Sequence, residues 1–274
     1  MKISEAWRVA ASPYPRFNTP PRVDDSRLVF GDCQIPYQDA DFLNKCKAVA
    51  FAYGVKKGVL GGDAIDFHAV SIFLAQFKQS LAEELDQDEI GLTSIAAGFD
   101  ELLWLCGNHE ERLSRMLQQW LPMERIAAML MLPPNVVTTN YYYCHLGDHW
   151  EATHPKNSSV IPGRIPSILA PKYKRNVISF HGHLVGAVMM NDYWAIDAGV
   201  TCDPERLEYS MVRQSTRPKV QRGAVLMLLD ADGVYHPKIL NDLTNWDAEV
   251  YAGEQWAKQK SQKPSASKSL KSRR

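Results

Sequence analysis

The chain has 274 residues, no formal net charge, 45% hydrophobic and 23% charged residues, which is an ordinary composition for a soluble globular protein. This length suits one large domain or two small ones and is sufficient to bury a core. The five cysteines are odd in number and form no CxxC pair, which argues against a zinc knuckle or a disulfide framework and favours reduced thiols in a cytoplasm. No apolar run approaches about 18 residues and no signal pattern opens the chain, so we expect a cytoplasmic protein without a membrane partner.

The two ends of the chain differ in composition from its body. Residues 1–25 contain four prolines and little periodicity, which predicts an irregular N-terminal arm. The last 17 residues hold seven basic and no acidic side chains, and we predict a basic disordered tail over residues 251–274. Such a tail could bind nucleic acid, although a solvated terminus without function is the simpler interpretation. A single domain is expected over residues 26–250, and its oligomeric state is left open.

In chain order, short apolar runs alternate with stretches of helical period. The runs are typical of strands, and each ends in a small or polar cluster; a turn at "DADG" predicts a C-terminal hairpin. Alternating strands and helices predict an α/β or α+β layered fold, in which polar clusters at strand ends are the usual place of an active site. The expected strands lie at 27–30, 58–61, 101–106, 149–153, 176–180, 193–200 and 223–240, and the expected helices at 37–54, 68–103 and 109–132.

Five successive strand ends deliver oxygen or nitrogen donors. Taken singly, an Asp after a strand is often a helix cap, a lone His is more often structural than a ligand, and Asn with Gly usually means a turn. The ordered set is better explained by a site for divalent metals, whose preferred ligands these side chains are. Its members are Asp32, Gln34, Asp63, Asn108, His109, His154, His181 and His183.

These residues can be assigned roles in a two-metal centre. Such a centre needs one acidic group that bridges both ions, and Asp63 in the glycine-flanked turn "GGD" suits that role. Asp32 would then serve one ion, and Asn108 with His154 the other. His109 would point away from the metals if its neighbour Asn108 points at them, so it is a candidate proton donor to a leaving group, oriented by Glu110 or Glu111.

The ordered motifs resemble those of the calcineurin-like metallophosphoesterases. That family's pattern is D-x-H, G-D, G-N-H-E/D, a lone H and G-H-x-H, and this chain offers "DCQ", "GD", "GNHE", "H" and "FHGH" in the same order over residues 31–183. The resemblance implies a four-layer α-β-β-α sandwich of two mixed sheets flanked by helices, with the strands at 193–200 and 223–229 both in its second sheet. The segments around residues 32 and 63 are also similar to metallophosphoesterases of bacteriophages, which would place the protein in a host cytoplasm.

The first departure from the family pattern is Gln34, which stands where the family usually has histidine. An amide oxygen is a harder and weaker ligand than imidazole, so the first metal site should be looser and should favour manganese or magnesium over zinc. We therefore expect two divalent ions, with manganese preferred and magnesium, iron or zinc as alternatives.

The second departure is the register of "FHGH". If Gly182-His183 corresponds to the family's G-H, Val185 occupies the second ligand position and supplies no donor. If the H-x-H spacing is matched instead, His181 and His183 are both ligands, and Phe180 replaces the family glycine. We favour the second alignment, because residues two apart on an extended segment point to the same side. His181 then joins Asp63, Asn108 and His154, whereas His183 joins Asp32, Gln34 and Asp63.

The leading functional hypothesis is hydrolysis of a phosphomonoester or phosphodiester. Its alternatives are a nuclease acting on DNA, a hydrolase that fills only the second metal site, and a non-catalytic scaffold that keeps the fold. Gln34 favours the scaffold, whereas the intact "GNHE" argues for an enzyme. Side chains near the motifs that could hold substrate or support the site carry less weight, and these are Asp66, His68, Arg112, Lys156 and Arg164.

Overall fold

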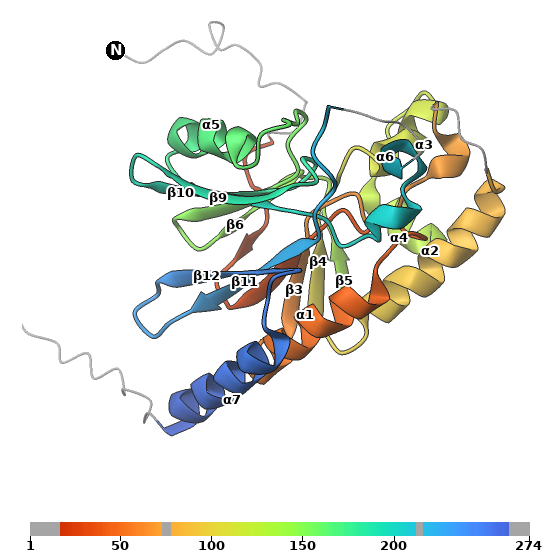
Figure 1. The fold of residues 1–274 in the computed structure, drawn as a ribbon. Helices are drawn as coiled ribbons and strands as arrows, with labels where there is room; N and C mark the ends of the chain where they lie inside the picture. Colours follow the sequence, from red (N-terminus) through yellow and green to blue (C-terminus); the bar gives the residue numbers. More distant parts are fainter. Residues whose placement is uncertain (1–16, 73–77, 212–215, 263–274) are drawn as a thin grey trace, which may run out of the picture.

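The computed structural model describes residues 17–72, 78–211 and 216–262. Two six-stranded mixed sheets lie face to face (Figure 1). The β2 sheet has the order β12-β11-β2-β3-β4-β5 and the β8 sheet the order β1-β6-β7-β8-β10-β9. The strands of the β2 sheet are Tyr235–Asn241, Gly223–Leu229, Arg27–Phe30, Lys57–Leu60, Glu101–Trp104 and Val136–Thr138 in that order, and those of the β8 sheet are Arg22–Val23, Tyr143–Leu146, Trp150–Thr153, Asn176–Ser179, Tyr193–Ala198 and Val185–Met190.

Helices cover the outer face of each sheet, which completes the predicted four-layer α/β sandwich. Figure 1 shows α5 over the β8 sheet, and α1 with α7 below the β2 sheet. Short 3₁₀ turns at His68–Val70 (η2) and Pro204–Arg206 (η3) supplement the helices. The helices are α1 Ala40–Ala52, α2 Leu81–Ala96, α3 Glu110–Met116, α4 Met123–Met129, α5 Arg164–Tyr173, α6 Glu208–Met211 and α7 Trp246–Gln262.

The central strands of the β2 sheet are buried on both faces. In β2, Leu28 and Phe30 belong to the core beneath the helices, whereas Val29 belongs to the core between the two sheets. In β4, Trp104 and Leu103 divide between the same two cores. This follows from the two-residue period of a strand, and it explains why these runs are continuously apolar in the sequence.

Local signals mark the starts of α1 and α2, although α2 covers only residues 81–96 of the helix predicted at 68–103. Asp39 caps α1 by accepting the N–H of Phe42, and Ser80 with Glu83 forms a capping box at the start of α2. The helical stretch predicted at 109–132 is divided into α3 and α4, which are separated by the segment that contains Pro122.

Three expectations about the fold are wrong. The strand at 223–229 (β11) lies in the β2 sheet and not beside β10, because it pairs antiparallel with β2. Residues 22–23 of the supposed irregular arm form β1, which pairs in parallel with β6. The disordered tail cannot begin at 251, because α7 continues to residue 262 and packs its Trp256 against Tyr53 of α1. Residues 1–16 and 263–274 lie outside the described residues.

Candidate metal centre

The candidate ligands follow parallel strands of both sheets. Strands β2, β3 and β4 run parallel to one another, and so do β7 and β8. The carboxyl ends of parallel strands meet at one edge of a sheet, which is where ligand sites of α/β folds form. Asp32 and Asp63 follow β2 and β3, His154 follows β7, and the His181–His183 turn follows β8. The site therefore joins the two sheets.

One group of predicted ligands converges around Asp63. Donor atoms of Asp63, His154 and His181 all lie within 4.8 Å of one another, the one such group of His, Cys, Asp or Glu among the described residues. Nε2 of His154 lies 3.3 Å from Oδ2 of Asp63 and 3.0 Å from Oδ1 of Asn108. Nδ1 of His154 lies 2.9 Å from the carbonyl oxygen of Gly61 and must carry the proton to make that hydrogen bond. When the ring is neutral, Nε2 therefore carries a lone pair directed at the group, as in a metal ligand.

A second group forms around Asp32. Nε2 of His183 lies 3.1 Å from Oδ1 of Asp32 and 3.3 Å from the amide nitrogen of Gln34. The two groups are tied together through the backbone, because the N–H of Gln34 donates to the carbonyl oxygen of Asp63 at 3.0 Å. The structure therefore brings Asp63, Asn108, His154 and His181 into one group and Asp32, Gln34 and His183 into a second. In Gln34 the amide nitrogen faces His183, so the side-chain amide must rotate for its oxygen to act as a ligand.

The backbone of these residues is left-handed. The segment carrying His181 and His183 is a turn, so our expectation of an extended segment is wrong. The two side chains still converge, but through bending of the chain. Left-handed backbone is uncommon outside glycine and costs about 1–3 kcal/mol per residue, and it concentrates at functional sites. The φ angles are 49° for Asp32, 46° for Gln34, 48° for Asp63, 68° for His181 and 60° for His183.

The carboxylate of Asp63 is the point where a cation fits best. Its Oδ1 accepts the backbone N–H of His109 at 2.8 Å, whereas Oδ2 is buried without a hydrogen-bond partner among the described residues. A buried carboxylate oxygen without a partner is costly unless a cation neutralises it. Asp32 and Glu110 add two further carboxylates that are at most 1% exposed. The donor set and its concentrated negative charge therefore fit a divalent metal.

His109 lies against this centre, and its partners differ from those predicted. Its Nδ1 is 2.8 Å from Oδ1 of Asp66, and its Nε2 is 3.5 Å from Oδ2 of Asp63. Nη2 of Arg112 lies 2.8 Å from the same Nε2, and Nη1 of Arg112 pairs with Asp66 at 2.9 Å. The expectation that His109 points away from the centre is wrong, because residue 109 has a helical backbone and its side chain does not alternate with that of Asn108 as in a strand.

Glu110 and Glu111 have other roles than orienting His109. The Glu110 carboxylate accepts the backbone N–H groups of Asp63, Ala64 and Gly107 at 3.0, 2.8 and 2.7 Å, so it joins the two ligand loops. A Cβ at residue 107 would lie 2.3 Å from Oδ1 of Asp63, which explains the glycine. Glu111 accepts the hydroxyl of Tyr142. Asp66 is the orienting carboxylate, and the sequence hint was its place three residues beyond Asp63.

Electrostatics at the centre follow from burial and close pairing. Burial acts to lower the pKa of His109, but the carboxylates of Asp63 and Asp66 raise it above the ordinary value of histidine. Burial also acts against the charged form of His154, yet Asp63, Asp32 and Glu110 raise its pKa to about 10. Burial, with a contribution from Asp63, raises the pKa of Glu110 to about 7. The buried negative charge at the centre thus favours the binding of positive charge, whether protons or cations.

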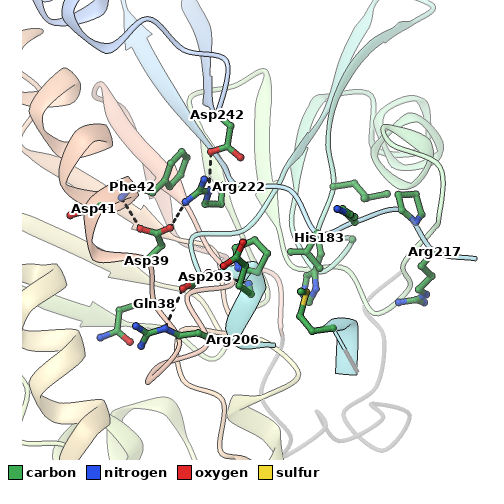
Figure 2. Close-up of a pocket in the computed structure, with 18 of the residues that line it drawn as sticks. Gln38, Asp39, Asp41, Phe42, His183, Asp203, Arg206, Arg217, Arg222 and Asp242 are labelled. Atoms are coloured by element: carbon green, nitrogen blue, oxygen red, sulfur yellow. Dashed lines mark hydrogen bonds and ion pairs between the residues drawn. The ribbon is translucent and has the colours of Figure 1, made fainter. Parts of the chain in front are cut away.

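A groove of about 1250 Å³ opens beside the second group, and Gly182 and His183 form part of its wall. Figure 2 shows His183 and Arg217 on one side of the groove and Arg222 with Asp39 and Asp242 on the other. Nη1 of Arg222 pairs with Asp39 at 2.5 Å and its Nε with Asp242 at 2.9 Å. The groove therefore carries mixed charge and has room for a ligand larger than a phosphate group.

The other candidates lie apart from the two ligand groups. Lys156 lines a smaller cavity of about 540 Å³ with His145, whose Nε2 is 3.6 Å from Glu151. Arg164 is the first residue of α5. The backbone N–H of His68 donates to Glu84 of α2, so this segment caps a buried carboxylate.

All five cysteines are free, as predicted from their number and spacing, and all five are buried. No helix within the described ranges is long and apolar enough to span a membrane.

Neither a family model nor a curated protein matches the chain. Among solved structures, vacuolar protein sorting 29 from Cryptosporidium parvum is 14% identical, with 79% of this chain and 96% of that chain covered at a TM-score of 0.39. The phosphoesterase YfcE from E. coli is 12% identical, with 79% and 98% covered at 0.38. Vps29 from Entamoeba histolytica in complex with zinc is 10% identical, with 79% and 98% covered at 0.34. At these values the likeness carries no conclusion about this chain, and it gives no support to a bacteriophage origin.

Proposed function

We propose that this protein is a calcineurin-like metallophosphoesterase, a hydrolase of phosphoric esters that uses two divalent cations. The observation that carries the proposal is the convergence of donor atoms of Asp63, His154 and His181, which all lie within 4.8 Å of one another. Asp63, Asn108, His154 and His181 would hold one ion, and Asp32, Gln34, His183 and Asp63 the other. The order of these motifs along the chain supports the same assignment.

Two divalent ions held by these residues, with manganese the preferred metal, would supply polarisation of a phosphoryl oxygen and a lowered pKa of a water molecule. His109 protonates the leaving oxygen, and Asp63 and Asp66 favour its protonated form because, against the effect of burial, they raise its pKa. Oδ1 of Asp66 lies 2.8 Å from Nδ1 of His109, and its charge orients the ring. Nη2 of Arg112, which pairs with Asp66, lies 2.8 Å from Nε2 of His109, and its fixed positive charge suits the binding of a phosphate oxygen.

The groove beside His183 suits the part of the substrate that leaves with the ester oxygen. Its volume of about 1250 Å³ is compatible with a nucleotide, a phosphopeptide or a nucleic-acid strand. Both phosphomonoesters and phosphodiesters therefore belong to the proposed substrate class, and cleavage of DNA is one form that the activity could take.

A scaffold without catalysis is the second candidate, and Gln34 is the observation in its favour. It presents its amide nitrogen to His183 at 3.3 Å, which is a weaker arrangement for a metal than a second imidazole. A scaffold, however, gives no reason for the paired His109, Asp66 and Arg112 in the same centre.

The two candidates are separated by loading the protein with manganese and assaying a chromogenic phosphodiester and phosphomonoester. The enzyme hypothesis predicts turnover of at least one ester, lost in Asp63→Asn and reduced in His109→Ala. If wild-type protein that binds manganese turns over neither ester with any divalent metal, the scaffold hypothesis is preferred. Lys156→Ala, outside the two ligand groups, is the control variant that should retain activity.

A further inference from the structure

Phe180 lies in a slot made by two glycines directly beneath the candidate metal centre. Its side chain is buried, with 2% of the residue exposed, at the position where the family pattern has glycine. A Cβ built on Gly31 would lie 2.7 Å from Cδ1 of the Phe180 ring, and one built on Gly61 would lie 2.1 Å from Cε2. Contacts between real Cβ atoms and their neighbours are not shorter than 3.0 Å, so both positions require glycine while the ring is present.

The ring contacts the strand ends that carry the ligands. Gly31 directly precedes Asp32, Gly61 lies two residues before Asp63, and Phe180 itself precedes His181. The backbone joins a fourth strand end, because the N–H of Phe180 donates at 3.1 Å to the carbonyl oxygen of the residue before His154. The ring thus lies against two loops of the β2 sheet, whereas the backbone of Phe180 belongs to the β8 sheet, and each of these segments carries a candidate ligand.

This arrangement differs from simple filling of the core. Phe180 also belongs to the apolar cluster between the sheets. So do Val29, Val59 and Ile178, which lie two residues before Gly31, Gly61 and Phe180, respectively. The Phe180 ring differs in that it also lies directly against the backbone of two glycines, Gly31 and Gly61. Side chains can repack around a smaller neighbour, but a backbone held by left-handed residues at Asp32 and Asp63 has fewer alternatives.

We propose that Phe180 is a positioning residue that sets the distance between the candidate metal ligands of the two sheets. Its ring packs across the hydrogen-bonded loops that carry Asp32 and Asp63, at Gly31 and Gly61, and holds these loops at a fixed distance from the His181–His183 turn. The inference rests on the proposed function in requiring that these loops bind metal. It goes beyond that function because it identifies Phe180 as a residue that supports the site, at a position where the family pattern has glycine.

The test is titration of the metal-free protein with manganese, with affinity and ions bound per chain as the readout. We expect Phe180→Ala to lower the affinity for at least one ion by about 10–100-fold, the range seen when residues supporting metal ligands are removed. Phe180→Leu, which refills most of the slot, should recover most of that affinity. Phe99→Ala is the matched control, because it removes an equally buried ring that packs on Phe30 and Phe51.

A second set of variants tests the contact between Phe180 and Gly61 even if Phe180→Ala fails to fold. Gly61→Ala alone should weaken manganese binding, because its Cβ collides with the ring. The double variant Gly61→Ala with Phe180→Leu should bind more tightly than Gly61→Ala, because the smaller side chain relieves the collision. Equal losses of affinity in Phe180→Ala and Phe99→Ala, or a double variant no better than Gly61→Ala, would overturn the inference. Wild-type protein that binds no manganese would instead contradict the proposed function.

Discussion

Asp63 is the residue with contacts that reach furthest across the candidate centre. Its backbone N–H is held by Glu110, its Oδ1 accepts from residue 109, and its Oδ2 faces His154 and His109 without a hydrogen bond. We expect Asp63→Asn to leave the fold intact, because the amide has nearly the same shape. The variant should lose the bridging charge and both ions, which elemental analysis of the dialysed protein measures. Two ions retained by Asp63→Asn would contradict the bridging role.

Gln34 allows a prediction about the strength of the first site. An amide ligand is weaker than imidazole, so dialysis of the manganese-loaded wild type should remove one ion per chain before the other. Gln34→His restores the family residue beside Asp32 and His183, and it should retain both ions under the same dialysis. If the wild type holds two ions as tightly as Gln34→His does, then Gln34 does not weaken the site.

His109 is predicted to assist the leaving group. His109→Ala should lower kcat by about 10²–10⁴-fold, the usual contribution of a positioned acid or base. The loss should be largest for alkyl phosphates, which need a proton to leave, and smallest for nitrophenyl esters. Asp66→Asn should give a smaller loss with the same dependence on the leaving group. Equal losses for good and poor leaving groups would indicate that His109 acts in some other way.

For single residues, the sequence predicted which side chains gather at the candidate site, but it predicted less of the contacts and backbone conformations that position them. The ends of strands can be located in the sequence, so Asp32, Asp63 and His154 could be named in advance as candidate ligands. The partner of His109 could not, because Asp66 reaches it only when two loops from different strands fold together. The left-handed backbone at His181 and His183 was also hidden, because it is imposed by tertiary contacts and these residue types seldom adopt it alone.

Among the elements, α2 carries a buried acidic side chain without a visible role in the helix. Asp88 is fully buried, and neither of its carboxylate oxygens has a hydrogen-bond partner among the described residues. Burial, with repulsion from Glu84, Asp66 and Glu110, raises the pKa of Asp88 to about 9. Because this value exceeds that of the unfolded chain, the folded protein holds an extra proton between about pH 4 and pH 9, and the unfolding free energy falls as pH rises through that window.

Asp88→Asn should remove this part of the pH dependence. At about 1.4 kcal/mol per pH unit, the wild type should lose up to about 4 kcal/mol more than Asp88→Asn between pH 5 and pH 8. Denaturant unfolding at the two pH values measures the difference. Asp86→Asn, on the exposed face of α2, is the control and should follow the wild type. Parallel pH profiles for wild type and Asp88→Asn would show that Asp88 is charged at both pH values or has an unseen partner.

The elements were predicted in part, since β5, β6, β9 and α5 were not foreseen, and the pairing of the predicted strands was not foreseen either. Helical period and caps were sufficient to place α1, and the turn at "DADG" was sufficient for the β11–β12 hairpin. The pairing of β11 with β2 was missed because periodicity gives a strand its faces but not its neighbours. The helix α7 was missed in part because its polar composition reads as a tail, although Trp246 and Trp256 pack on α1.

For the whole molecule, the decisive feature is that the centre takes ligands from both sheets. Asp32 and Asp63 follow strands of the β2 sheet, whereas His154 and His183 follow strands of the β8 sheet. Ions bound only by the folded protein should therefore stabilise the whole sandwich. At 100 times the dissociation constant the gain is about 2.7 kcal/mol, so chelation should lower Tm by roughly 5–10 °C. An unchanged Tm would contradict a centre that joins the sheets.

The most direct test of the central claim combines metal counting and turnover on one sample. Wild-type protein loaded with manganese should hold two ions per chain and hydrolyse a chromogenic phosphoester, and chelation should abolish the hydrolysis until manganese is restored. Asp63→Asn, treated in parallel, should show neither the ions nor the activity. Wild-type protein that remains free of metal under these conditions, or hydrolysis that persists unchanged after the metal is removed, would contradict the account.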